Sequence, residues 1–264
     1  MYNFTYHRPA SIAEAVKLVS GAAEGKFLAG GMTLIPTLKQ RLAKPSDVVD
    51  LAKIGDLKGI KKDGSSIVVG AMTRHVEVAT SDVVKGAIPA LAALAEGIGD
   101  PQVRHRGTIG GSIANNDPAA DYPAALVALG ATVHTNKRKI AADAFFKGLF
   151  ETALDASEIV TAVQFPVPEK AAYMKFPNPA SRYAIVGVFV AKGPSGVRVA
   201  VTGAGPAVFR QKEMEAALGK SWAPDAVANV KVAASGLNSD IHASAEYRAH
   251  LVGVMAKRAV AAAK

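Results

Sequence analysis

The chain has 264 residues, of which 50% are hydrophobic and 20% are charged, and it contains no cysteine. This composition excludes an extensively disordered chain, and the lack of cysteine excludes disulfides, a thiol nucleophile and iron–sulfur or cysteine–zinc centres held by this chain. No apolar run approaches the ~20 residues that span a bilayer. Residues 1–8 also lack the charged lead and apolar stretch of a signal peptide, so a cytoplasmic location is expected.

The formal charge of +9 is unevenly distributed. Residues 1–170 carry 19 Lys and Arg against 17 Asp and Glu, whereas residues 171–264 carry 12 against 5. A solvated surface is the simplest interpretation of this basic segment, and a docking face around Arg210, Lys212 and Lys220 is the alternative. Because aromatic residues make up only 6% of the chain, we expect no nucleic-acid partner.

The first 55 residues predict a small parallel β-α-β-α-β unit. A helix over 11–20 begins at a Ser-x-x-Glu capping box. The other expected elements are strands at 3–6, 26–29 and 47–51 and a helix at 33–42.

The central part of the chain predicts a hairpin, several helices and a long stretch without clean periodicity over 99–122. Asp63-Gly64 is a strong turn signal between the hairpin strands, and Pro166 to Pro168 is the best candidate domain boundary. The expected elements are hairpin strands at 59–62 and 66–69, helices at 73–80, 88–97 and 123–129, and strands at 131–135 and 158–165.

The last region predicts an antiparallel strand pair and then helices. The strands are expected at 185–191 and 196–202, joined at 193–196, and the helices at 209–218, 224–235 and 244–263. Strands followed by helices indicate an α+β unit. We therefore predict an α+β protein with domains at 1–170 and 171–264, the first divided into subdomains of about 1–55 and 56–170.

Two glycine-centred segments are candidate ligand sites. The first comprises Leu28, Ala29, Gly30, Gly31, Met32, Thr33 and Leu34. It lies between a predicted strand and a predicted helix, where a glycine pair allows close backbone approach and free N–H groups bind phosphate. Taken alone, an ordinary strand-to-helix turn explains it as well.

The second segment runs from Gly107 to Asp121 and includes Thr108, Ile109, Gly110, Gly111 and Ser112. Its mixture of small, polar and apolar residues is typical of a buried loop laid against a polar ligand. Gly110 and Gly111 are expected to give main-chain donors to an anion, and Asp121 to accept hydrogen bonds from sugar hydroxyls. A structural Ω-loop is the alternative, but two such segments in one domain favour a ligand.

Other chemical motifs are missing from the sequence. It has no GxGxxG, Walker A, GxSxG or HExxH pattern, so no metal site and no catalytic side chain are predicted. Phosphate-binding segments without an acid, base or nucleophile indicate that a bound cofactor performs the chemistry.

The two glycine segments and the residues around them resemble those of a known family. The segments Ala29-Gly30-Gly31-x-Thr33-Leu34, Thr108 to Ser112 and Asp117-Pro118-Ala119-Ala120-Asp121 are similar to those of the FAD-binding medium subunit of molybdenum hydroxylases. That family includes carbon monoxide dehydrogenase and bacterial xanthine dehydrogenases. The resemblance covers essentially the whole chain. It implies a two-subdomain FAD-binding domain of the PCMH type, followed by a C-terminal α+β flavoprotein domain.

The resemblance also implies roles for individual residues. Residues 28–34 would wrap the FAD pyrophosphate, residues 108–112 would form the second wall, and Asp121 would bind a ribose hydroxyl. Apolar contacts with the cofactor fall on Ile98 and Val160, a lysine near the flavin on Lys175, and an aromatic ring over the isoalloxazine on Tyr183.

The implied partners are an iron–sulfur small subunit and a large subunit with the molybdenum cofactor. Electrons would pass from the iron–sulfur clusters through FAD to an external acceptor. Two alternatives remain at this stage, a stand-alone FAD-dependent oxidoreductase and a non-catalytic basic binding module.

Overall fold

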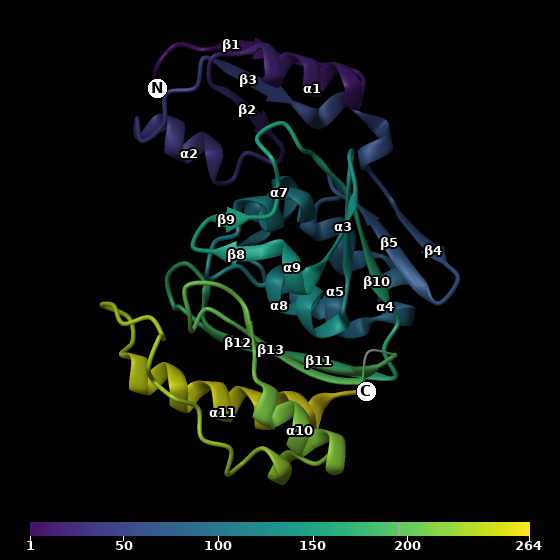
Figure 1. Cartoon of the computed structure of the whole chain (residues 1–264), viewed down its shortest axis with the longest axis vertical. Coiled ribbons are helices and arrows are strands. Elements are labelled where there is room, and N and C mark those ends of the chain that lie inside the picture. The colour runs from purple at the N-terminus through teal and green to yellow at the C-terminus, as the bar shows by residue number, and fades with distance from the viewer. Residues whose placement is uncertain (195) are drawn as a thin grey trace.

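The computed structural model describes residues 1–194 and 196–264. Three units follow one another along the molecule, with the N-terminal subdomain at one end, the central subdomain in the middle and the C-terminal domain at the other end (Figure 1). The turn expected at 193–196 includes Ser195, which lies outside the described residues.

The N-terminal subdomain is built on the predicted parallel sheet. Its strands β1 (Thr5–His7), β2 (Gly25–Leu28) and β3 (Asp47–Asp50) lie in the order β1-β3-β2, with both pairs parallel. The helices are α1 (Ile12–Gly21) and α2 (Leu34–Lys39), followed by the 3-10 turns η1 (Leu51–Lys53) and η2 (Gly55–Leu57). The Ser11 hydroxyl accepts the Glu14 N–H at 3.2 Å, so the predicted cap of α1 is confirmed.

The central subdomain contains an antiparallel five-stranded sheet in the order β4-β5-β10-β6-β7. These strands are β4 (Ile60–Asp63), β5 (Ser66–Gly70), β6 (Thr132–Thr135), β7 (Lys139–Ala141) and β10 (Val160–Pro166). Its other elements are α3 (His75–Thr80), α4 (Asp82–Ala87), α5 (Pro89–Glu96), α6 (Pro101–Arg106), α7 (Ile109–Asn115), α8 (Tyr122–Leu129), α9 (Ala142–Phe145), β8 (Phe146–Gly148) and β9 (Glu151–Thr152).

Helix α8 joins the central subdomain to the C-terminal domain. All eight of its residues are buried, as expected for a helix that is apolar on every side. It contacts α5 and β10 on one side and three strands of the C-terminal sheet on the other. The core of the central subdomain therefore continues into the C-terminal domain, where it includes Phe189, Ala191 and Ala200.

The C-terminal domain is an antiparallel sheet covered by helices. The strands are β11 (Lys170–Pro177), β12 (Ala184–Gly193), β13 (Gly196–Thr202) and β14 (Phe209–Arg210), in that order across the sheet. Helices α10 (Lys212–Lys220) and α11 (Ala245–Ala262) pack on the face opposite α8. Strand β12 is covered on both faces, which explains its continuous apolar run.

One prediction of secondary structure is wrong, and other elements were not predicted. The helix expected at 224–235 is only the 3-10 turn η3 (Pro224–Ala226), because Val227, Val230 and Val232 pack separately against the C-terminal core. The stretch at 99–122 holds α6 and α7, which are too short to show a helical period. Strand β11 was not predicted at all.

Candidate functional site

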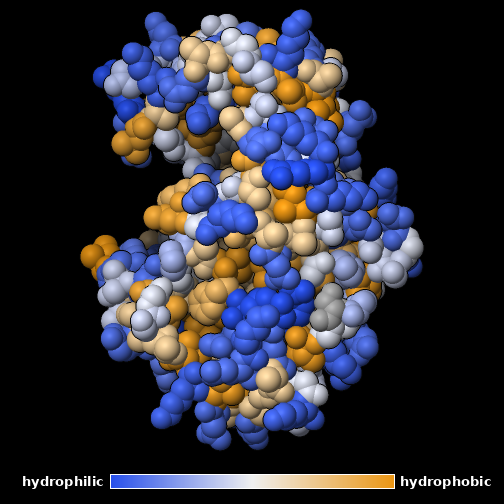
Figure 2. Space-filling model, viewed as in Figure 1, coloured by the Kyte–Doolittle hydropathy of each residue, from blue (hydrophilic) through white to orange (hydrophobic). Residues whose placement is uncertain are grey.

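A cavity of about 650 Å³ lies where the three units meet. Figure 2 shows the surface hollowed between the N-terminal subdomain and the central one. The walls come from both glycine segments, the start of α3, residues 152–160 before and at the start of β10, and the loop between β11 and β12. The predicted residues that line it are Ala29, Gly30, Gly31, Met32, Thr33, Leu34, Ile98, Thr108, Gly110, Gly111, Ser112, Asp121, Val160 and Tyr183.

The two glycine segments touch each other at the cavity wall. A Cβ atom placed on Gly30 would lie 2.1 Å from the carbonyl oxygen of Arg106 and 2.8 Å from the Cα of Gly107. Gly31 adopts a φ of +78°, a conformation that favours glycine. Each glycine of the first pair is therefore required for a different reason, Gly30 for the close approach of the second segment and Gly31 for the turn of the backbone.

The first segment offers main-chain donors to the cavity. Among the described residues, we find no hydrogen-bond acceptor for the N–H groups of Met32, Thr33 and Leu34, which lie at the start of α2. The Thr33 hydroxyl makes no capping bond. This cluster of donors beside two glycines suits a phosphate group.

The second segment differs from its prediction. The Gly110 N–H donates to the carbonyl oxygen of Ala71 at 2.8 Å, and the Gly111 N–H donates to the Thr108 hydroxyl at 3.2 Å. These groups are therefore not free donors for an anion, because the Thr108 hydroxyl that caps α7 accepts the Gly111 N–H and the Ala71 carbonyl accepts the N–H of Gly110. A Cβ on Gly110 would lie 2.5 Å from the Ala71 Cβ, so this glycine allows the loop to pack against the scaffold.

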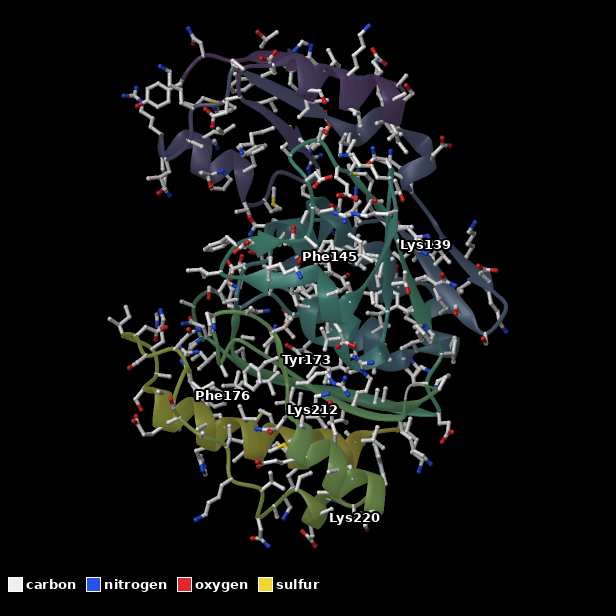
Figure 3. All side chains as sticks on the ribbon, in the orientation of Figure 1. Lys139, Phe145, Tyr173, Phe176, Lys212 and Lys220 are labelled. Carbon is white, nitrogen blue, oxygen red and sulfur yellow. The ribbon has the colours of Figure 1, made fainter. Side chains whose placement is uncertain are left out.

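Asp121 faces the cavity but already has partners inside the protein. Its carboxylate accepts a short hydrogen bond from the Tyr173 hydroxyl and lies 3.1 Å from Lys175 Nζ. Burial raises the pKa of Asp121, and the ammonium of Lys175 opposes that shift. Lys175 also donates to the carbonyl oxygen of Gly97 at 2.7 Å. Tyr173 lies at the junction between the C-terminal sheet and the central subdomain (Figure 3).

Three of the predicted residues lie outside the cavity lining. Leu28 ends β2 behind Gly31, and Ile109 is fully buried in the central core. Lys175 reaches the cavity only through its contact with Asp121. In contrast, Tyr183 is 47% exposed and lies at the wall contributed by the C-terminal domain.

Sequence reasoning missed His75, which lines the cavity from the start of α3. Its ring is buried and lies 5.4 Å from the ring of Tyr122. Burial, reinforced by the charge of Arg104, lowers the pKa of His75 to about 4, so the ring is neutral near pH 7. A single histidine after a hairpin carries no sequence signal of this position.

Residues 152–159 were also missed, although Val160 beside them was predicted. Thr152, Leu154, Asp155, Ala156, Glu158 and Ile159 line the cavity. One feature of the sequence could have indicated this segment. Glu158 precedes the apolar residues Ile159 and Val160, which places an acidic group at the edge of a buried strand.

Some of the basic side chains of the C-terminal domain form ion pairs within the protein. Arg198 pairs with Asp143, Arg210 with Glu215, and Arg248 with Asp240. Lys212 is 70% exposed on α10, and Lys220 lies at the far end of the same helix (Figure 3).

The fold and the cavity define a two-subdomain ligand-binding domain followed by a C-terminal α+β domain. Residues 2–168 match the family described as "FAD binding domain in molybdopterin dehydrogenase", and residues 171–263 match the "CO dehydrogenase flavoprotein C-terminal domain". The chain therefore belongs to the FAD-binding subunit family of molybdopterin dehydrogenases, and its cofactor is FAD. The predicted family, fold class and cofactor are confirmed.

Individual relatives cover nearly the whole chain. The carbon monoxide dehydrogenase medium chain of Hydrogenophaga pseudoflava is 35% identical, over 98% of this chain and 96% of its own length. The nicotine 6-hydroxylase medium subunit of Paenarthrobacter nicotinovorans is 36% identical, over 97% and 95%. The solved structure of reconstituted CO dehydrogenase from Oligotropha carboxidovorans gives a TM-score of 0.91 at 36% identity, over 98% and 96%.

The residues at the cavity fit FAD. Unpaired N–H groups next to Gly30 and Gly31 suit its pyrophosphate, and Ile98 and Val160 offer apolar surface for its rings. Among the described residues, no group of three His, Cys, Asp or Glu side chains is placed to hold a metal ion. In the same part of the chain, no helix has the length and apolar character needed to cross a membrane.

Proposed function

We propose that this chain carries electrons within a multisubunit molybdenum hydroxylase of the cytoplasm. Its partners are an iron–sulfur small subunit, which supplies electrons, and a large subunit with the molybdenum cofactor. An external acceptor receives the electrons in turn. Bound FAD supplies the redox chemistry, since a flavin accepts and releases one or two electrons.

The chain's own residues hold the cofactor and shape its surroundings. We assign the N–H groups of Met32, Thr33 and Leu34 to the pyrophosphate, together with the Thr33 hydroxyl. Residues 108–112 form the opposite wall by close packing. Leu28 and Ile109 support these walls from behind.

The remaining residues are assigned to the parts of FAD beyond its pyrophosphate. Asp121 keeps lone pairs for a ribose hydroxyl besides its bonds to Tyr173 and Lys175, because a carboxylate accepts about four hydrogen bonds. Lys175 holds that carboxylate in place and adds positive charge beneath the cavity. Tyr183 is exposed at the wall, where its ring can cover a flavin.

The contact of the two glycine segments carries the proposal. Segments far apart in the sequence meet at Gly30 and Gly107, and the adjoining residues Met32 to Leu34, whose N–H groups have no acceptor among the described residues, line the same cavity. The first N–H groups of a helix have no partners within the helix, and at the start of α2 their residues line a cavity instead of facing open solvent. A bound anionic group satisfies them.

The test has two parts. First, the purified chain is heated, and the released chromophore is identified and counted, with expectation of FAD in equimolar amount. Second, the chain is purified from its native cell under mild conditions, and the complex is analysed for molybdenum and iron. FAD together with both metals supports the proposal. FAD without either metal favours a stand-alone flavoprotein, and failure to bind added FAD refutes both functions.

A further inference from the structure

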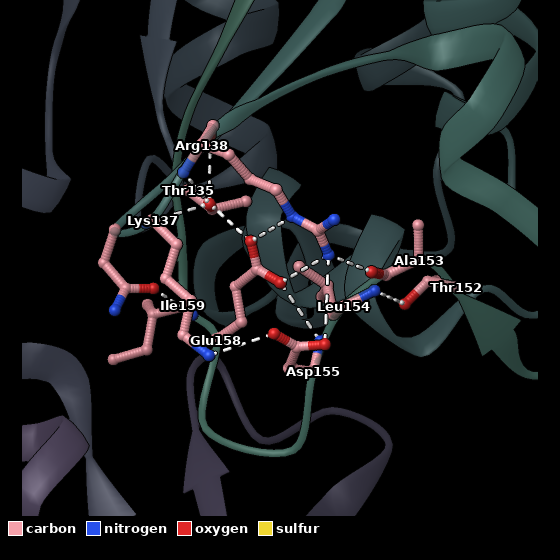
Figure 4. A network of polar contacts seen from close by, with 10 residues as sticks. Thr135, Lys137, Arg138, Thr152, Ala153, Leu154, Asp155, Glu158 and Ile159 are labelled. Carbon is pink, nitrogen blue, oxygen red and sulfur yellow. Dashed lines mark hydrogen bonds and ion pairs between the residues drawn. The ribbon is translucent and has the colours of Figure 1, made fainter.

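The turn between β6 and β7 is hydrogen-bonded to residues 153–159, which lie at the cavity just before β10 (Figure 4). We call Thr135, Asn136 and Arg138, together with Glu158, the clasp. The Arg138 guanidinium donates to both oxygens of the Glu158 carboxylate, from Nε at 3.0 Å and from Nη2 at 2.9 Å. The same Nη2 donates to the carbonyl oxygen of Ala153 at 2.7 Å. One arginine thus ties both ends of the segment 153–158.

Glu158 is fully saturated with hydrogen bonds. Besides Arg138, its carboxylate accepts the Thr135 hydroxyl at 2.6 Å and the Asp155 N–H at 3.1 Å. The side chain is completely buried. The bonds from Arg138, followed by those from Thr135 and Asp155, lower the pKa of Glu158 to about 2 despite its burial. The Glu158 carboxylate therefore stays ionised throughout the physiological pH range.

Asn136 holds the next residue through both backbone groups. Its side-chain oxygen accepts the Ile159 N–H at 2.8 Å, and its own N–H donates to the Ile159 carbonyl oxygen at 3.0 Å. The Ile159 side chain is buried in the core of the N-terminal subdomain, with Val49, Ile54 and Leu57. Within the described residues, Ile159 is the one member of that core that comes from beyond residue 72.

These contacts place the clasp between the two subdomains that enclose the cavity. Its turn belongs to the central sheet, whereas Ile159 belongs to the N-terminal core. Leu154, Asp155 and Ile159 line the cavity, but Arg138 and Asn136 do not. Any movement of the turn is thus transmitted to the cavity wall and to the N-terminal subdomain.

We propose that Asn136, Arg138 and Glu158 are positioning residues for the cofactor, which act by fixing the 153–159 wall and the spacing of the two subdomains. The inference rests on the proposed function in one respect, that FAD occupies this cavity. A cofactor held on two sides requires walls fixed to within about 1 Å, so loosening the clasp weakens binding and changes the surroundings of the flavin.

The experiment uses the full chain freed of cofactor and titrated with FAD, with flavin fluorescence as the signal. Glu158→Gln keeps the size of the side chain but removes the charge that orients Arg138, and we expect the Kd for FAD to rise about tenfold or more. Asn136→Ala removes one bond to Ile159 and is expected to raise the Kd about threefold. Lys139→Ala is the matched control, since Lys139 follows the same turn, is exposed, and has a side chain that makes no hydrogen bond or ion pair within the described residues.

The visible circular dichroism of the flavin at saturating FAD separates positioning from simple stability. We expect Glu158→Gln and Asn136→Ala to change this spectrum and Lys139→Ala to leave it unchanged. If Glu158→Gln fails to fold, the FAD affinity and the spectrum of Asn136→Ala test the proposal. Wild-type affinity and an unchanged spectrum in the folded variants would overturn the clasp while leaving the proposed function intact. Failure of the wild-type chain to bind FAD would instead overturn both.

Discussion

Replacing Gly30 by alanine tests whether the contact between the glycine segments builds the cavity. The added Cβ would lie 2.1 Å from the Arg106 carbonyl oxygen, 2.7 Å from its carbonyl carbon and 2.8 Å from the Gly107 Cα. All three atoms belong to the backbone, so no side chain can turn away to make room. To restore even a 3.0 Å contact, the two segments must separate by about 1 Å.

The expected cost follows from that displacement. Overpacking of this kind costs about 1–3 kcal/mol, and a loss of 1.4 kcal/mol in binding is about a tenfold rise in Kd. Because the unpaired N–H groups of Met32 and Thr33 move with Gly30, we expect the Kd for FAD to rise roughly 10- to 100-fold. Thermal unfolding with and without a fixed excess of FAD measures the loss, since the stabilisation by a bound ligand grows with the logarithm of its concentration divided by Kd.

Gly21→Ala is the control, because a Cβ at Gly21 meets nothing within 4 Å in the same subdomain. It should leave the Kd for FAD unchanged. If Gly30→Ala folds and binds FAD as tightly as the wild-type chain, the meeting of the two segments does not determine the site, and our assignment of the pyrophosphate position is wrong.

Three further predictions concern single positions. His75 is neutral in the folded state, with a pKa of about 4 against an ordinary value of 6.5, so the unfolded chain binds more protons in this interval. The free energy of unfolding should fall by about 2 kcal/mol between pH 8 and pH 5, and His75→Phe should flatten that dependence in chemical denaturation. Lys175→Met leaves Asp121 buried without its cation and should cost about 3 kcal/mol, part of which Asp121→Asn restores in the double variant. Gly110→Val should abolish soluble expression rather than selectively lower FAD content, because its side chain meets Ala71 and not the cavity.

Local patterns predicted the parts of the fold that local physics determines. The capping box at Ser11 and the Asp63-Gly64 turn were sufficient to place a helix and a hairpin. The helix expected at 224–235 was wrong because apolar spacing does not reveal whether valines share a helical face or pack one by one. That distinction depends on the surface opposite them, which is made by α11 and the C-terminal sheet.

The site divides in the same way. A glycine pair in a sequence indicates that the backbone needs freedom, but not which neighbour approaches it. For Gly30 the neighbour is the other glycine segment, whereas for Gly110 it is Ala71 of the scaffold. The direction of an N–H group is therefore beyond a sequence pattern, and the donors expected from Gly110 and Gly111 turned out to be engaged. His75 and Tyr173 were missed because each is placed by a partner distant in the chain. The partner of His75 is Tyr122, and the partner of Tyr173 is Asp121.

The placement of these groups bears on what kind of protein this is. The cavity walls come from all three units, and the charged groups beneath them, Lys175 with Asp121 and Arg138 with Glu158, each join two segments distant in the chain. Both pairs are held by internal hydrogen bonds, which makes them suited to hold a shape and poorly suited to transfer protons. Such an arrangement favours a chain that holds a redox cofactor at a fixed place, since electron transfer depends on where the carrier lies. The affinity for FAD is accordingly the most direct measure of whether the three units are correctly assembled.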